Sequence, residues 1–313
     1  NPSILIDREG FLHVFYGGHN KKMRYSRSSK PLSNDDWEDY TSRLPYTEST
    51  YPQLFVMSDG TIYSFYRRKT HRGNWSYVTS KDIGSTWSKE VHVLDGRSPP
   101  GNGWYTAFTK DPNRDHIHLM FLWHASKDNL PHSRRNLYYM HMDHSAGKWT
   151  SMKNEELKTP LSFEEANESV MIFDSKNKYS SIPQHWVTVD GRPVGLNRIS
   201  EDDGVAIRHL HVWTGETWRT QKVPIDVLLK PTKKEWVGFR SREGTVQRFT
   251  SKDEGAHWTP GEVILKTDGE QNLNALFAQA HPDAVLVIVD KVDEQRVPGK
   301  QRLWVWGAAG FLD

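Results

Sequence analysis

A short turn motif recurs along this chain and constrains its fold more than any other feature. The segment SKDIGSTW at 80–87 returns almost unchanged as SKDEGAHW at 251–258. In such a turn the Ser and Asp side chains satisfy backbone N–H groups, Gly takes the left-handed conformation, and Trp packs beneath the turn. Weaker copies of the motif are MDHSAGKW (142–149), WTGETW (213–218) and the remnant SNDDW (33–37). Asp82 and Asp253 are therefore interpreted as turn residues and not as catalytic acids.

Hairpin patterns accompany these turns. Each joins two short apolar strands through a turn of Asp, Gly or Asn, which is a strong local signal for a β-hairpin. The four clearest examples are LIDREGFLHVFY (5–16), VMSDGTIYSFYR (56–67), TKDPNRDHIHLMFLW (109–123) and VTVDGRPVGLNR (187–198).

Six modules result, each with three or four predicted strands and the length of a propeller blade. They span 1–48, 50–97, 103–152, 167–224, 227–266 and 270–308. Helical periodicity is nearly absent, and only PLSNDDW and TPLSFEEANE have room for a helical turn. The recurring turn is the Asp-box, which resembles the turns of sialidase-type propellers. We predict an all-β protein, with residues 1–313 forming a single seven-bladed β-propeller domain. Six blades, or a pair of β-sandwiches, are the alternatives, although sandwiches do not repeat an Asp-box.

Composition excludes several classes of protein. The chain has 313 residues with 13 Trp, 12 Tyr and 12 Phe, which indicates a folded protein. A net charge of +2 gives no bulk attraction to nucleic acid. The absence of Cys excludes disulfides, Cys-ligated zinc and thiol catalysis. No apolar run approaches the ~20 residues that span a bilayer.

The chain opens at Asn1 inside a strand-like pattern, without Met and without a visible signal peptide. We expect sequence upstream to have been removed, and we expect a secreted or periplasmic bacterial protein that acts as a monomer.

Positive charge is concentrated at the end of the second hairpin. The segment 51–75 begins with Tyr51 and carries a dense group of basic residues after its second strand: Arg67, Arg68, Lys69, His71 and Arg72. An antiparallel hairpin brings its two ends together, so Tyr51 and Arg67 are expected to face each other. Strand alternation directs Arg68 to the opposite face. The basic loop is either a solvated loop or a rim that attracts an acidic polymer.

Four pieces in order carry a family resemblance. They are NPSILIDREGFLHVFYGGH (1–19), RYSRS (24–28), TYPQLFVMSDGTIYSFYRR (50–68) and the set WYTAF, HIHLMFLWH and NLYYMHMD within 104–143. Together they resemble the BNR-repeat propeller family that holds the ulvan lyases. The resemblance covers the first half of the chain well, and the second half only in its blade pattern.

The resemblance implies a polysaccharide lyase that cuts at a uronic acid, with ulvan as the leading substrate, by β-elimination. Such chemistry needs a group that neutralises the C6 carboxylate, a base for the C5 proton and an acid for the departing O4. Arg or protonated His suits the first role. His or Tyr suits the others, provided that positive charge lowers the pKa of the Tyr.

The family's catalytic group matches three positions in this sequence. A Tyr before Pro matches Tyr51, an Arg at the end of the next strand matches Arg67, and a His at the end of an earlier inner strand matches His19. A substrate-facing Tyr matches Tyr105. Arg67 and His19 are expected to hold the carboxylate, while either Tyr51 or His19 is the base. The family pattern places one more His just before Asn1, outside the given sequence.

Further residues are expected to bind substrate, and one cluster suggests a metal. The expected substrate-binding residues are Tyr105, Arg68, Lys69, His71, Arg72 and His124. The loose cluster His116, His118, His141 and His144 suggests a structural calcium or zinc ion, although its spacing fits no standard zinc motif. Catalysis is expected to need no cofactor, since Arg and His neutralise the carboxylate.

Two other functions stay open at this point. A sialidase-like glycoside hydrolase would need paired carboxylates and an Arg triad. The Arg-Ile-Pro motif of sialidases is absent, since Ile182-Pro183 follows Ser181. A non-catalytic carbohydrate-binding propeller would keep the basic and aromatic rim but lack the proton-transfer residues.

Overall fold

The computed structural model describes residues 2–70, 72–97, 102–125, 134–200, 205–228, 233–267, 272–277, 284–291, 303–307 and 310–312. The chain divides into two compact units, Asn1–Ile182 and Pro183–Asp313. Each unit is described by itself.

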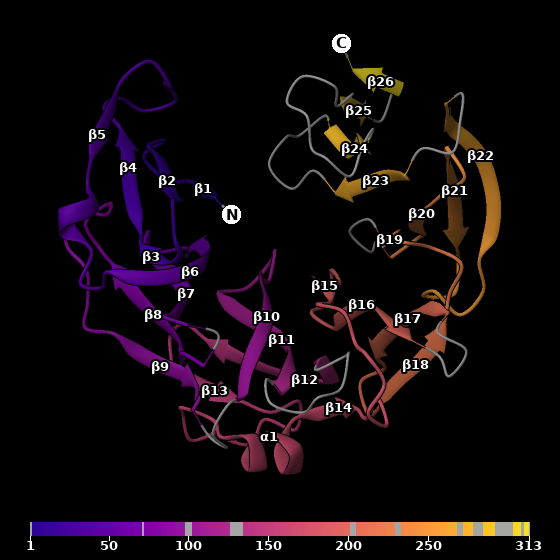
Figure 1. The fold of residues 1–313 in the computed structure, drawn as a ribbon, viewed down its shortest axis with the longest axis horizontal. Coiled ribbons are helices and arrows are strands. Elements are labelled where there is room, and N and C mark those ends of the chain that lie inside the picture. The colour runs from indigo at the N-terminus through magenta and orange to yellow at the C-terminus, as the bar shows by residue number, and fades with distance from the viewer. Residues whose placement is uncertain are drawn as a thin grey trace. The chain divides into compact units, whose positions relative to one another are not determined.

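Among its described residues, the first unit contains three antiparallel sheets (Figure 1). The first has the order β1 (Ser3–Ile6), β2 (Leu12–Tyr16), β4 (Arg24–Ser28), β5 (Trp37–Asp39). The second has the order β3 (His19–Lys22), β6 (Glu48–Val56), β7 (Ile62–Arg68), β8 (Trp75–Ser80), β9 (Val91–Leu94). The third has the order β10 (Asn102–Lys110), β11 (His116–Ala125), β12 (Arg134–Asp143), β13 (Lys148–Thr150), with β14 (Met171–Phe173) also paired to β12.

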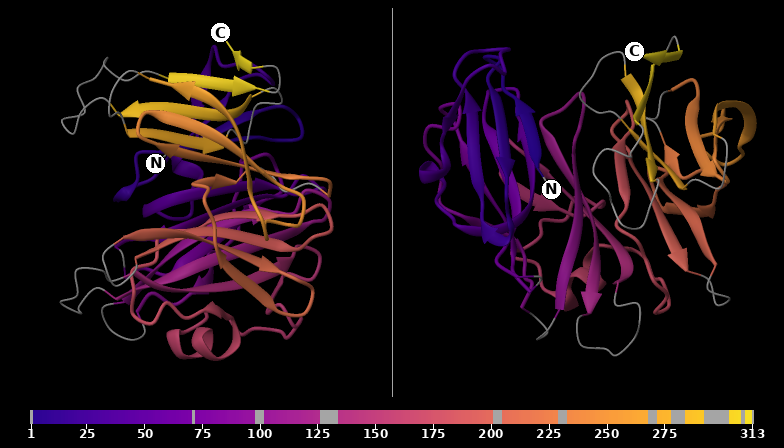
Figure 2. Two further views of the ribbon diagram at one scale, coloured as in Figure 1. Left: turned by 90° about the vertical axis from the view of Figure 1, so that its right-hand side faces the viewer. Right: turned by 45° about the horizontal axis from the view of Figure 1, so that its top comes forward.

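The second unit contains three four-stranded antiparallel sheets among its described residues, and Figure 2 shows the twist of the strands from two further sides. The first sheet is β15 (Gln184–Val187), β16 (Pro193–Ser200), β17 (Ala206–Trp213), β18 (Trp218–Lys222). The next is β19 (Val227–Leu228), β20 (Trp236–Arg242), β21 (Thr245–Ser251), β22 (Thr259–Lys266). The last is β23 (Asn272–Phe277), β24 (Ala284–Lys291), β25 (Leu303–Gly307), β26 (Gly310–Leu312).

These six sheets, counted over the described ranges, follow the six predicted modules closely. The main difference is β3, which lies in the first module but pairs with β6 of the second sheet. The helix α1 (Phe163–Ser169) forms within TPLSFEEANE, where Ser162 and Glu165 make a capping box. PLSNDDW forms no helix, and a short 3₁₀ helix, η1, covers Thr41–Arg43 instead. Within the described ranges, no helix has the length and apolar character needed to span a membrane.

Aromatic packing fixes the second sheet against the third. Trp75 on β8 and Trp104 on β10 are both fully buried in one core cluster. The indole N–H of Trp75 donates to the carbonyl oxygen of Trp104 over 2.9 Å. Phe65 on β7 stacks on Phe108 of β10, with ring centroids 4.2 Å apart. The strand ends of these two sheets are thereby held in a fixed relation, and the candidate site lies there.

The two strong turn motifs make the same set of hydrogen bonds. The N–H of Gly84 donates to Ser80 Oγ over 2.9 Å, and the N–H of Thr86 donates to Asp82 Oδ1 over 2.8 Å. In the second turn, Gly255 donates to Ser251 over 2.8 Å and His257 to Asp253 over 2.9 Å. Both aspartates are thus engaged in holding their own turns.

We expect Gly84→Ala to destabilise the protein strongly. Gly84 has φ +81°, and an added Cβ would lie 1.8 Å from the hydroxyl oxygen of Tyr25. Left-handed strain and overpacking together should cost about 3 kcal/mol or more. Urea denaturation measures the loss.

Gly60→Ala is the matched control, because Gly60 has φ +88° but nothing within 4 Å of the added Cβ. It should lose only about 1 kcal/mol. Equal losses in the two variants would contradict the proposed close packing of the turn on Tyr25.

Candidate active site

A bulge in β6 sets the position of Tyr51. The pairing of β6 with β7 shifts register between Thr50 and Gln53, and Tyr51 has φ +56°. A bulky residue in the left-handed region is unusual, and bulges often re-aim a side chain beside an active site. The predicted hairpin segment begins with Tyr51, whereas β6 itself begins earlier, at Glu48. The ring of Tyr51 lies against Trp75, with centroids 6.5 Å apart and an interplanar angle of 11°.

Arg67 lies where the sequence analysis expected it, facing Tyr51. Thr50 pairs with Arg67 across the ladder, and the guanidinium carbon lies 5.0 Å from the centroid of the Tyr51 ring. Arg67 is only 2% exposed, and its Nε and Nη1 have no hydrogen-bond partner among the described protein groups. Buried N–H groups are nearly always satisfied, so the remaining donor capacity of Arg67 is a functional signal.

His19 joins the same group from β3. Its ring meets that of Tyr51 edge-on at a centroid distance of 5.9 Å, and its Nδ1 lies 3.4 Å from Thr50 Oγ1. The residue is exposed and is the first residue of β3, whereas the sequence analysis placed it at the end of an earlier strand. Pairing of His19 with Thr50 is what brings it to Tyr51.

Tyr105 extends the group toward the third sheet. Its ring centroid lies 6.0 Å from that of Tyr51 and 5.3 Å from that of His124. Two guanidinium carbons lie over the Tyr105 ring, that of Arg134 at 4.3 Å and that of Arg67 at 5.5 Å. The predicted residues His19, Tyr51, Arg67, Tyr105 and His124 are therefore brought together.

Arg134 and Trp75 also belong to the site, although they were not among the residues predicted from the sequence. Arg134 begins β12 and pairs with His124, which in turn pairs with Gly103 at the start of β10. Arg134 is a basic residue at a strand end, as Arg67 is, and that position is the signal that could have found it. Trp75 carried no separate signal, because a Trp in a strand is ordinarily a core residue.

A cavity of about 250 Å³ opens beside these residues, here called the tyrosine cavity. The described residues that line it are Tyr51, Pro52, Gln53, Trp75, Tyr105, Thr106 and Ile182. The side chain of Gln53 bridges to β10, accepting from the Phe108 N–H over 3.0 Å and donating to Thr106 Oγ1 over 3.3 Å. The cavity combines aromatic faces with phenol groups, as carbohydrate sites commonly do.

The two tyrosines differ in acidity. Burial raises the pKa of Tyr51, and the neighbouring Tyr105 raises it further, against the effect of Arg67. Burial also acts to raise the pKa of Tyr105, but the charge of Arg134 and hydrogen bonds from Arg67 and Arg134 outweigh it, so this pKa lies below its usual value. A tyrosine acts as a base only if its pKa is lowered. Tyr105 has a lowered pKa and Tyr51 does not. Tyr51 holds its proton at neutral pH and suits the role of an acid.

The predicted basic residues divide between two faces of the sheet. Arg68 is exposed and pairs with Glu90, on the face opposite to Arg67, as strand alternation predicted. Lys69 and Arg72 are exposed and line a second cavity with Arg68. His71 lies outside the described residues.

The predicted histidine cluster separates into two places. The rings of His116, His118 and His141 lie 5.8–6.3 Å apart on the third sheet. His144 instead bonds Tyr63 through Nδ1 and Asp59 through Nε2. The described residues include no group of three or more His, Asp or Glu side chains arranged to hold a metal ion. A structural metal stays a prediction.

Acid should destabilise the protein through buried histidines. Burial, helped by His118 and His116, lowers the pKa of His141 to about 4, from a model-compound value of 6.5. As the pH falls below about 6.5, the unfolded chain binds a proton at this residue while the folded chain does not. The contribution of His141 to the free energy of unfolding is therefore fully present above that pH and is lost as the pH falls toward 4. Lowering the pH from about 7 to about 5 should cost about 2 kcal/mol at this residue.

Urea denaturation at the two pH values measures this loss. His141→Gln keeps a polar group beside Thr150, which His141 contacts through Nε2 at 3.1 Å. The variant should depend less on pH than the parent. An unchanged pH dependence in the variant would contradict a neutral buried His141.

Comparisons with known proteins show what the chain is similar to. The profile of a family described as a BNR repeat-containing family member matches residues 1–225. A relative named ulvan lyase from Nonlabens ulvanivorans is 28% identical over 340 residues, covering 93% of this chain and 70% of the relative. A solved structure titled as a polysaccharide lyase, PL25 ulvan lyase, matches with a TM-score of 0.84 at 23% identity, covering 99% of this chain and 79% of that one. The form of that lyase bound to -[GlcA(1-4)Rha3S]- matches equally well. These likenesses confirm the predicted all-β propeller fold.

Proposed function

This chain belongs to the BNR repeat-containing family, and we propose that it is a polysaccharide lyase that cleaves ulvan by β-elimination. The family predicted from the sequence is thus confirmed. The named relatives support the lyase activity, since the chain covers most of each of them.

The unpaired donors of Arg67 support this function most directly. A buried guanidinium with two N–H groups free of protein partners is matched to a planar anion such as a uronate carboxylate. Neutralising that carboxylate is the step that makes the C5 proton acidic, and it must occur beside a base and an acid. Arg67 and His19 both contact the ring of Tyr51, so the three side chains form one group.

The proposed reaction uses groups of this chain alone. With the carboxylate held by Arg67, His19 removes the C5 proton, and the electron pair of the C5–H bond forms the C4–C5 double bond. The C4–O4 bond breaks, and O4 takes the proton that Tyr51 carries. Tyr105, held by Arg67 and Arg134, keeps Tyr51 oriented and protonated. The reaction consumes no water.

The glycoside-hydrolase alternative has no support in the site. Hydrolysis of that kind uses two carboxyl groups flanking the scissile bond. None of the described residues lining the tyrosine cavity is Asp or Glu. A non-catalytic carbohydrate-binding propeller would lack the proton-transfer residues, whereas His19 and Tyr51 are both present, with Arg67 against the Tyr51 ring. A turnover assay separates this alternative from the lyase.

Several finer points belong to the same proposal. The described residues form six sheets, and a seventh blade is proposed because the matching lyase structure extends beyond the region matched here. A secreted or periplasmic location is proposed because the substrate is a polymer too large to enter a cell. A monomer is proposed as well. Cell fractionation and light scattering would test these two points.

The lyase assay is direct. The protein is mixed with ulvan, and ultraviolet absorbance of the unsaturated uronyl product is followed. We expect the absorbance to rise, with reducing ends increasing in parallel. Increasing reducing ends without a rise in absorbance would indicate hydrolysis. Binding of ulvan with neither signal would leave a carbohydrate-binding propeller.

A further inference from the structure

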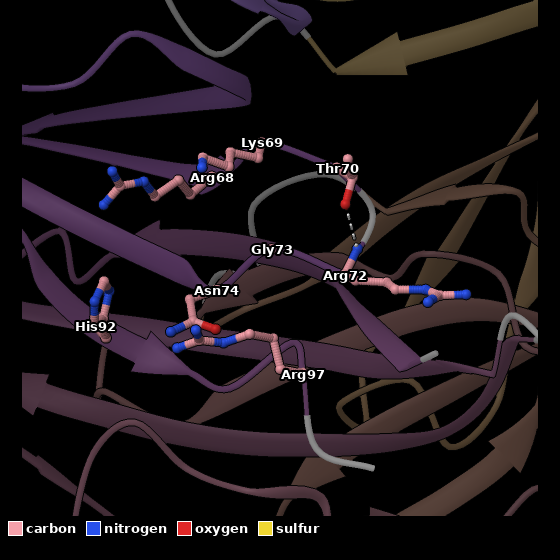
Figure 3. A pocket seen from close by; sticks show the side chains of 8 residues that line it. All are labelled: Arg68, Lys69, Thr70, Arg72, Gly73, Asn74, His92 and Arg97. Carbon is pink, nitrogen blue, oxygen red and sulfur yellow. Dashed lines mark hydrogen bonds between the residues drawn. The ribbon is translucent and has the colours of Figure 1, made fainter. Parts of the chain in front are cut away.

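A second cavity lies on the other side of the strands that carry Arg67 and Trp75. It measures about 410 Å³, large enough for a sugar residue. Its described lining, drawn in Figure 3, is Arg68, Lys69, Thr70, Arg72, Gly73, Asn74, His92 and Arg97. We call it the basic cavity. None of these lining residues is acidic.

Its charge is only partly neutralised. Arg68 pairs with Glu90, and Arg97 lies 3.8 Å from Asp95. Among the described residues, no carboxylate lies within ion-pairing distance of Lys69 or Arg72. The cavity therefore keeps excess positive charge, which attracts an anion.

Backbone packing holds the loop that joins β7 to β8. The N–H of Arg68 donates to the Asn74 carbonyl over 2.9 Å, and that of Lys69 donates to the Glu48 carbonyl over 2.9 Å. A Cβ on Gly73 would lie 1.4 Å from the Arg68 carbonyl oxygen, and one on Gly96 would lie 2.3 Å from the Gly73 carbonyl oxygen. These close approaches hold the described part of the loop against its neighbours, which favours a built site over a solvated loop.

Asn74 supplies a neutral donor at the base of the cavity. It is 5% exposed, and its Oδ1 accepts from the Gly96 N–H over 3.1 Å. That bond fixes the amide, so the Nδ2 group is left to donate to a ligand. The lining thus offers guanidinium, ammonium, hydroxyl and amide donors. Such a set suits an anion whose oxygens accept hydrogen bonds from several directions.

The two cavities are adjacent along the chain. Arg67 and Arg68 are consecutive on β7 and point to opposite faces, while Asn74 precedes Trp75, which lines the tyrosine cavity. The loop that lines the basic cavity begins at Lys69, directly after β7, so it extends from the strand end that carries Arg67. A polymer whose uronate reaches Arg67 is expected to pass this strand end. In the repeat bound to the matching lyase, -[GlcA(1-4)Rha3S]-, the sugar next to the uronate carries a sulfate.

We propose that the basic cavity is a subsite for the sulfate ester of the sugar next to the cleaved uronate. This inference rests on the proposed lyase function, and it assigns the preference for sulfated polymer to residues outside the catalytic group. Lys69, Arg72, Arg97 and the Asn74 amide bind the sulfate oxygens. The carboxylate and the sulfate are thus recognised by different arginines.

Two variants test the cavity. Asn74→Asp keeps the oxygen that accepts from Gly96 but replaces the donor with a negative charge, so it should repel sulfate without removing the loop contact. The double variant Lys69→Gln/Arg97→Gln removes two cations. Lys81→Gln is the control, because Lys81 is exposed and follows β8 at the end opposite to Asn74.

The kcat/KM of each protein is measured on ulvan and on chemically desulfated ulvan. Charge-assisted hydrogen bonds predict that the parent and Lys81→Gln prefer the sulfated polymer by about ten- to a hundredfold. Both cavity variants should lose this preference while keeping parental activity on the desulfated polymer, which also shows that they are folded. An equal loss on both polymers, or an unchanged preference, would overturn the inference.

Calorimetric binding separates this inference from the lyase proposal. Sulfated and desulfated ulvan oligosaccharides are titrated into the protein carrying Tyr51→Phe, with and without Asn74→Asp. Tighter binding of the sulfated form, lost with Asn74→Asp, supports the subsite even if no absorbance rises in the lyase assay. Equal binding of the two forms would overturn the subsite even if the lyase assay succeeds.

Discussion

Arg67→Ala should abolish the lyase activity, with kcat/KM on ulvan falling by about a thousandfold or more. Removing one preorganised group that stabilises developing charge typically costs a hundred- to a thousandfold. Arg67 also supports Tyr105 by a hydrogen bond that lowers the pKa of that residue. The substitution should therefore disturb two features of the site together. Initial rates from the ultraviolet assay measure the loss.

Arg67→Lys separates charge from geometry. A lysine keeps the positive charge but has a single ammonium group, which cannot reach the carboxylate while also contacting Tyr51 and Tyr105 as the planar guanidinium does. We expect it to recover only a small part of the lost rate. Recovery to within about threefold of the parent would contradict a specific guanidinium–carboxylate contact.

Arg68→Ala is the comparison for position. It also truncates an arginine, but the neighbouring one, whose side chain is exposed on the opposite face of the strand. Its effect should be far smaller and confined to sulfated polymer. Thermal melting of all three variants checks folding, because Arg67 is buried and its truncation leaves a cavity.

Local patterns were enough to predict the sheets, because each hairpin of this fold is encoded by alternating apolar residues and a turn. The Asp-Gly turn at Asp59 predicted the pairing of β6 with β7, and that pairing placed Tyr51 near Arg67. The same reasoning failed for β3. That strand has four exposed residues, so no apolar alternation marks it, and only its pairing with β6 brings His19 to the site.

The chemistry of the tyrosines could not be predicted in the same way. A pKa depends on burial and on charges from other strands, and Arg134 approaches Tyr105 from β12 although 29 residues separate them in sequence. The bulge at Tyr51 is equally invisible locally, since a residue before proline ordinarily takes an extended conformation. The basic cavity also depends on His92, which lies on β9, and on Arg97, which follows β9, so both are distant in sequence from Arg68.

Tyr51→Phe should lower kcat by about a hundred- to ten-thousandfold while changing KM little. General acid catalysis contributes a factor of this size, and the phenol proton is needed only as O4 departs. The Phe ring should keep its place against Trp75, so the variant should melt like the parent. An unchanged kcat would remove Tyr51 from the mechanism. A raised KM with normal kcat would reassign it to substrate binding.

The pH profile decides which way Tyr51 moves its proton. Its pKa is raised above the usual value of 10.0, so the acid form persists well into the alkaline range. An enzyme that uses Tyr51 as the acid should keep its kcat up to about pH 9, after correction for uncatalysed elimination. An enzyme that needs the Tyr51 phenolate as a base would instead show kcat rising about tenfold per pH unit through that range. Tyr105→Phe sharpens the test by removing the phenol that Arg67 and Arg134 hold. The part of the upward Tyr51 pKa shift that comes from Tyr105 should be lost, while the larger part that comes from burial stays, so the alkaline loss of activity should move to lower pH.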